Sequence, residues 1–130
     1  MSFSDLHQIE TKLLAILQDV PDYKEGHHLG RPFLTAYQVA IEFARRHPAI
    51  TEALGHPIGG VGSGKHYSLS TYVARILSEM VKREPGGPVE GGFLSNLHLH
   101  TVQFEHEDAI IASSLTSTPF TLSMFRIRDR

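Results

Sequence analysis

A glycine-rich stretch at residues 55–66 carries the side chains and backbone best suited to binding an anion in this 130-residue chain. Five of the eleven glycines lie there, with one lysine and two histidines. Glycines let successive backbone N–H groups turn towards one point, and a lysine adds positive charge. A helix that begins after the stretch would add its positive end. We therefore expect a phosphate-type anion to bind here, and the candidate ligand-binding residues are Gly60, Gly62, Ser63, Gly64, Lys65 and His66.

Part of this stretch, from Gly59 to Lys65, resembles the phosphate-binding loop of nucleoside triphosphatases. That loop has the pattern G-x-x-x-x-G-K followed by Ser or Thr, and the resemblance implies phosphate binding. It covers seven residues, and His66 stands where the hydroxyl that holds magnesium is expected. No apolar run long enough for a buried strand precedes Gly59. The sequence therefore favours anion binding over nucleotide hydrolysis.

The pair His98 and His100 suggests a second chemistry, metal binding. Two imidazoles two positions apart on a strand share one face, about 6–7 Å apart, and can chelate one metal ion. A third ligand would have to come from elsewhere in the chain, for which the candidates are His27, His28, His56 and His66. The simpler interpretation is that both histidines cover the solvent side of a strand.

With Gly92 and Glu105, the histidine pair resembles the first metal motif of the cupins, which implies a metal site in a double-stranded barrel. Ala112 occupies the position where that motif has glycine, and no histidine follows His106 to form the second motif. A small metal-dependent or phosphate-handling enzyme is therefore the alternative to a binding module. No cofactor can be named from the sequence.

A second glycine-flanked loop, around Gly26 and Gly30, precedes Arg31. We take Arg31 as a secondary ligand-binding candidate because a guanidinium suits anion recognition.

Apolar residues at helical spacing predict three main helices and one short helical turn that position these candidates. The predicted helices span residues 5–20, 32–47 and 68–83, and the turn spans residues 49–54. Pro32 is expected in a first helical turn, Ser68 as an N-cap and Gly55 as a C-terminal cap. The apolar stripe of the last helix is assigned to the core.

Three apolar or alternating runs at residues 93–104, 109–115 and 120–128 predict strands, with a charged hairpin turn at residues 105–108. Near Met124, apolar residues change faces, which indicates a bulge or burial on both sides of the strand. The expected fold class is α+β: three main helices followed by a three-stranded antiparallel β-meander packed on them, in one domain covering residues 1–130.

Helices followed by a small antiparallel sheet also resemble the outline of a winged helix, which implies nucleic-acid binding. The connection at residues 55–67 is longer than the turn of about 3–4 residues in a helix-turn-helix. Residues 65–85 hold four basic and two acidic side chains, a net charge of +2. Because this is only mildly basic, we rank nucleic acid below a phosphate-containing small molecule as the partner.

Composition excludes several other classes of protein. The chain has a net charge of −2 and no cysteine, which excludes disulfides, a thiolate nucleophile and Cys-ligated zinc. It is also histidine-rich, with nine histidines. No targeting segment or membrane span is expected, and cytoplasmic residence in a bacterial cell is the interpretation we adopt. The favoured function is a non-catalytic binding module, and its oligomeric state stays open, with a homodimer among the alternatives.

Overall fold

The computed structural model describes residues 3–21, 29–59, 68–114 and 122–128, and within these ranges it is an α+β fold with antiparallel sheets, as predicted. The elements in chain order are α1 (Phe3–Gln18), β1 (Leu34–Thr35), α2 (Ala36–Arg46), α3 (Pro48–Leu54), α4 (Leu69–Arg83), β2 (Val89–Leu94), β3 (Thr101–His106), β4 (Ala109–Ser114) and β5 (Leu122–Ile127). None of the helices in these ranges is long and apolar enough to cross a membrane.

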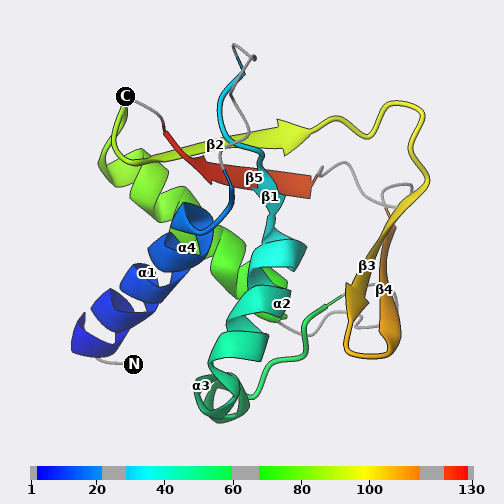
Figure 1. Cartoon of the computed structure of the whole chain (residues 1–130), viewed down its shortest axis with the longest axis horizontal. Helices are drawn as coiled ribbons and strands as arrows, with labels where there is room; N and C mark the ends of the chain where they lie inside the picture. The colour runs from blue at the N-terminus through cyan, green and yellow to red at the C-terminus, as the bar shows by residue number, and fades with distance from the viewer. Residues whose placement is uncertain (1–2, 22–28, 60–67, 115–121, 129–130) are drawn as a thin grey trace.

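The strands form two separate sheets rather than the single meander that we expected (Figure 1). One sheet has the order β1-β5-β2, so that the last strand lies in its centre. The other is the two-stranded hairpin of β3 and β4. The predicted hairpin turn is confirmed, because His106 pairs with Ala109 across it.

The predicted strand at residues 93–104 is wrong, because this segment contains the end of β2, a turn and the start of β3. β2 already begins at Val89 and includes Gly91 and Gly92, which lie before the start of the predicted strand. Packing favours glycine at position 91, since a Cβ there would lie 3.2 Å from the ring of Phe125, a tight contact.

Helix α2 begins at Ala36 and not in the turn of Pro32. The side-chain oxygen of Thr35 accepts from the backbone N–H of Gln38 (3.2 Å), and the Gln38 side chain accepts from the N–H of Thr35 (2.7 Å). This capping box fixes the first turn of the helix. The residues before it therefore extend and pair with β5 as β1.

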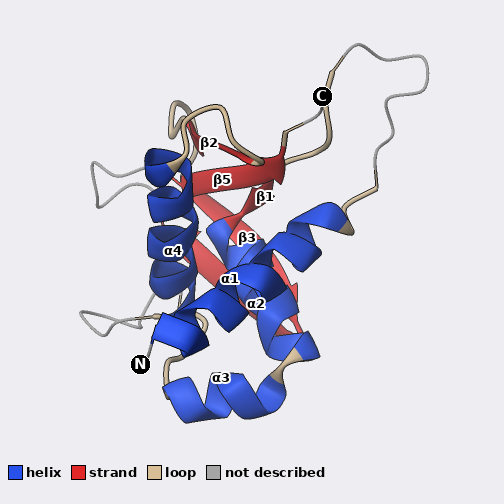
Figure 2. Ribbon diagram, turned by 90° about the vertical axis from the view of Figure 1, so that its left-hand side faces the viewer, coloured by secondary structure: helices blue, strands red, loops and turns tan. Residues whose placement is uncertain are grey.

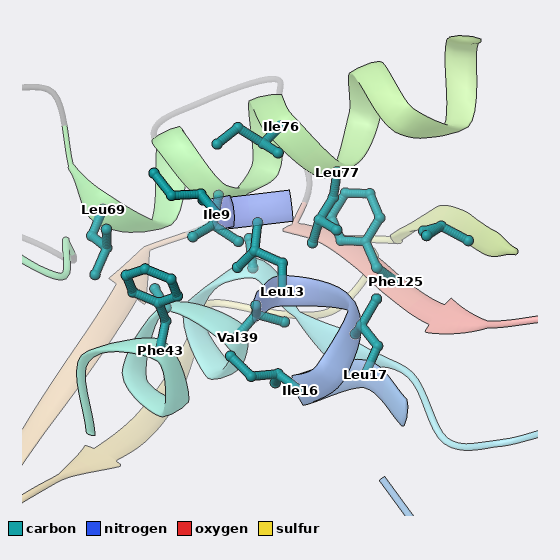
Figure 3. Close-up of a cluster of buried hydrophobic side chains, with 14 residues drawn as sticks. Ile9, Leu13, Ile16, Leu17, Val39, Phe43, Leu69, Ile76, Leu77 and Phe125 are labelled. Atoms are coloured by element: carbon teal, nitrogen blue, oxygen red, sulfur yellow. The ribbon is translucent and has the colours of Figure 1, made fainter. Parts of the chain in front are cut away.

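The main core lies between α1, α2, α4 and the inner face of the β1-β5-β2 sheet (Figures 2 and 3). Figure 3 shows Leu13 of α1 and Val39 of α2 in the middle of this cluster, with Leu77 of α4 and Phe125 of β5 towards one side and Phe43 of α2 towards the other. The predicted apolar stripe of α4 is confirmed as core, with Leu69, Val73, Ile76 and Leu77 buried.

A smaller cluster attaches the β3–β4 hairpin to the rest of the fold. Phe104 stacks on Tyr37 of α2, with ring centroids 5.0 Å apart, and packs with Leu122. Leu122 and Phe125 lie on opposite faces of β5, and the pairing with β2 is continuous through Met124. Of the two alternatives near Met124, burial on both sides is therefore confirmed and a bulge is not formed.

Candidate functional site

The anion-binding residues predicted in the glycine-rich loop, Gly60, Gly62, Ser63, Gly64, Lys65 and His66, lie outside the described residues. The start of α4, directly after them, is described. There the backbone N–H groups of Leu69 and Ser70 donate to the carbonyl oxygens of Pro57 (2.7 Å) and Ile58 (3.0 Å). The N–H of Thr71 donates to the Oγ of its N-cap, Ser68 (3.1 Å).

These bonds correct one part of the sequence interpretation. An anion at a helix N-terminus binds to the N–H groups that the first turn leaves without partners. In α4 the chain itself already supplies acceptors to the N–H groups of Leu69, Ser70 and Thr71. The N-terminus of α4 therefore does not offer free backbone N–H groups at these three residues. The sequence analysis had expected this positive helix end to contribute to anion binding at the loop.

Arg31, the secondary candidate, contacts the end of α1. Its Nη1 donates to the carbonyl oxygens of Gln18 (2.9 Å) and Val20 (3.2 Å). The carbonyl oxygen of Arg31 in turn accepts from Arg126 (3.0 Å). These bonds tie the segment before β1 to the last turn of α1 and to β5, so Arg31 has a structural role whether or not it also binds a ligand.

The histidine pair does not lie on a strand. His98 and His100 belong to the connection between β2 and β3, and His98 has a left-handed backbone with φ of 63°. Both side chains are exposed. The expected chelating geometry, with two imidazoles on one strand face, is therefore absent. Among the described residues, no group of three or more His, Asp or Glu side chains could hold a metal ion.

The solvent face of α4 is a polar stripe that the sequence analysis did not single out. Thr71, Arg75, Ser78 and Lys82 follow each other at spacings of four, three and four residues, so they lie on one face of the helix. All four are exposed, whereas the opposite stripe is core. The sequence contained a signal for this stripe: where apolar residues at helical spacing mark one face of a helix, the polar residues between them mark the opposite face. We call these four residues the α4 stripe.

A groove of about 500 Å³ lies between the α4 stripe and β2. Thr71, Arg75 and Ser78 line it on the helix side, and Gly91, Gly92 and Phe93 line it on the strand side. Phe93 is 73% exposed, although it lies on the same strand face as the buried Val89. Sequence reasoning could not find this groove because it depends on where α4 stops covering the sheet.

The groove is lined by one basic and one acidic side chain, Arg75 and Glu79, and the helix beside it is positive as a whole. Helix α4 has three basic side chains and one acidic one, Glu79, a net charge of +2. The β3–β4 hairpin has three acidic side chains and no lysine or arginine over residues 101–114, a net charge of −3. The net charge of −2 for the whole chain thus conceals a locally positive helix.

A second cavity, of about 600 Å³, lies between α2, α3 and the hairpin turn, and Glu42, Arg45 and His106 are among the residues that line it. Glu42 accepts hydrogen bonds from Arg45 (2.9 and 2.6 Å) and from Arg46 (2.7 Å). The bonds from Arg45 and Arg46 outweigh the effect of burial and lower the pKa of Glu42 to about 2. Its carboxylate therefore serves to connect neighbouring turns of α2.

Comparison with known proteins adds no family to these observations. No family model matches this chain, no curated protein matches its sequence and no solved structure matches its fold.

Proposed function

We propose that this chain is a nucleic-acid-binding module that contacts its ligand through the α4 stripe. The observation that carries the proposal is the order of the sheet, β1-β5-β2, with β1 directly before α2 and α4 directly before β2. Winged-helix domains, whose outline the sequence resembles, have this order of helices and strands. The proposal infers a similar function from this similar topology. The basic and hydroxyl side chains on the exposed face of α4 support it.

Two insertions distinguish this chain from a minimal winged helix. Residues 47–68, which include α3, separate α2 from α4, and residues 95–121, which include the hairpin, separate β2 from β5. The first connection precedes α4 in the chain and the second follows β2, so neither interrupts the helix. Within the described part of the chain, the α4 stripe stays exposed despite these insertions.

The side chains of the α4 stripe fit a phosphodiester ligand. Arginine, lysine and hydroxyl side chains supply most side-chain contacts to phosphates, and arginine also reads guanine edges. The loop at residues 55–66 precedes α4 in the chain, and we propose Lys65, Gly60, Gly62, Ser63, Gly64 and His66 as additional phosphate contacts. A nucleic acid would then supply the phosphate-type anion that the loop composition indicates. Glu79 is the one acidic side chain of α4 and should oppose binding.

Fluorescence anisotropy with labelled DNA of mixed sequence tests the proposal. Affinity should fall steeply between about 50 mM and about 200 mM salt, because phosphate contacts release counterions. Lys82→Ala should weaken binding about fivefold and reduce the salt slope by about one. Glu79→Gln should strengthen binding about twofold to fivefold, since a repelling charge is removed.

Arg45→Ala is the matched control, because it also removes one exposed positive charge but lies on α2, beside the acidic hairpin. It should leave DNA affinity unchanged. Lys65→Ala, in the same assay and with inorganic phosphate, tests the loop separately. No binding at the lowest salt, or equal losses for Lys82→Ala and Arg45→Ala, would reject the proposed function.

A further inference from the structure

We infer that the groove beside α4 holds one unpaired base of the bound nucleic acid, stacked on Phe93. This inference rests on the proposed function and adds the class of nucleic acid, one that contains single-stranded or bulged nucleotides.

Phe93 lies at the exposed end of a strand face that is buried where β2 begins. Residues 89, 91 and 93 share one face of β2, and Val89 on that face is 2% exposed whereas Phe93 is 73% exposed. The strand therefore leaves the cover of the helices within four residues. A phenyl ring at that point keeps a large apolar surface in water, which a flat apolar ligand would cover.

The groove opposite Phe93 has the dimensions and walls that a base needs. Its volume of about 500 Å³ falls in the range of small-molecule sites and exceeds that of a single nucleobase. Gly91, on the same strand face as Phe93, has no side chain to obstruct it. A planar ring can therefore approach the strand backbone closely and lie against Phe93.

The other wall of the groove provides polar recognition. Thr71, Arg75 and Ser78 line it from α4, together with the acidic Glu79. Hydroxyl and guanidinium groups, and a carboxylate that accepts from a base amino group, can bond to the edges of an unstacked base. Arg75 and Lys82, which precede and follow Glu79 on α4, place positive charge for the phosphates on either side of that base. A base inside a duplex presents no free face for stacking, so the groove selects unpaired nucleotides.

Binding of single-stranded DNA, and of a duplex with the same sequence, tests the inference. The wild-type protein should bind the single strand more tightly at equal salt, and a 2-aminopurine in it should be quenched on binding. Phe93→Ala should weaken single-strand binding about 5- to 100-fold and abolish the quenching, because stacking on one aromatic ring is lost. Its duplex affinity and salt slope should stay unchanged.

Leu97→Ala is the matched control, since Leu97 is an apolar residue with 71% exposure four positions further on, outside the groove lining. It should behave as wild type in both assays. Because Phe93 and Leu97 are both exposed, the two variants should keep the wild-type thermal midpoint.

The outcomes separate the two proposals. Duplex binding without a preference for single strands, or a Phe93→Ala protein that binds both as wild type does, would overturn the base pocket and leave nucleic-acid binding standing. If the wild-type chain forms a dimer, and Phe93→Ala disrupts that dimer but keeps single-strand affinity, this face binds a second copy of the chain. That result would also overturn the base pocket. No DNA binding at all would reject both.

Discussion

His47 joins two helices and combines several physical constraints in one residue. Its backbone N–H donates to the carbonyl oxygen of Phe43 (2.8 Å) at the end of α2, and its own carbonyl accepts from Thr51 in α3 (3.0 Å). Its ring lies 5.2 Å from the ring of Phe43. Burial, followed by the positive charges of Lys12 and Arg46, lowers the pKa of His47 below its ordinary 6.5.

This lowered pKa predicts a loss of stability in mild acid. As the pH falls below about 6.5, the unfolded chain takes up the proton at His47 before the folded chain does, so the free energy of unfolding decreases until the lowered pKa is passed. Above pH 6.5 the contribution is fully present. Urea unfolding at several pH values should show a smaller decrease for His47→Gln than for wild type.

The exposed His100→Gln is the control for this titration and should follow the wild-type profile. The free energy of unfolding of His47→Gln and of wild type could instead decrease by the same amount between about pH 7.5 and about pH 5. Protonation of His47 would then not be the cause of the acid sensitivity.

At the scale of single residues, the sequence predicted features that depend on the nearest few positions. The N-cap at Ser68 and the left-handed Gly55 at the end of α3 are confirmed, because a cap is determined by its own turn. The geometry of His98 and His100 was predicted wrongly, since it depends on where a strand ends. The ion pairs of Arg45 and Arg46 with Glu42 have the i,i+3 and i,i+4 spacing typical of a helix, a local signal that the sequence analysis did not use.

Strand β2 shows how packing between elements overrides a local rule. Glycines weaken strands, and the predicted strand began only after Gly91 and Gly92, at residue 93. In the structure they pair with Phe125 and Met124 of β5. At position 91 the close approach of Phe125 on the partner strand favours glycine, and one sequence segment alone does not reveal that contact.

Two adjacent substitutions in β2 test this explanation. Gly91→Ala should lower the free energy of unfolding by about 1–3 kcal/mol, because the new methyl group crowds the buried Phe125 at 3.2 Å. Gly92→Ala makes the same chemical change in open space, and it should be neutral or raise the free energy by about 0.5–1 kcal/mol through the unfolded chain. Urea unfolding measures both values. Equal effects of the two substitutions would show that crowding by Phe125 is not the cause.

For the whole molecule, the sequence predicted the α+β class and the core stripes of the helices, because these follow from periodicity along one segment. The split into two sheets could not be predicted in this way. It depends on which strand pairs with β5, a choice between segments far apart in the chain. The candidate groove depends on the same choice, since β2 forms one of its walls.

The division into two sheets also predicts two levels of stability. The β3–β4 hairpin is a two-stranded sheet that adjoins the rest through the small cluster around Phe104 and Leu122, whereas β2 and β5 belong to the main core. Isolated hairpins are marginally stable in water, so this unit should open without global unfolding. Hydrogen exchange should therefore be faster in β3 and β4 than in β5.

Phe104→Ala, which removes the stack on Tyr37, should accelerate exchange in the hairpin by an amount equivalent to about 2 kcal/mol or more and leave α1 and α4 unchanged. Ile110→Ala, at an exposed position of β4, is the control and should have little effect. Equal acceleration throughout the protein in the Phe104→Ala variant would mean that hairpin and core unfold as one unit.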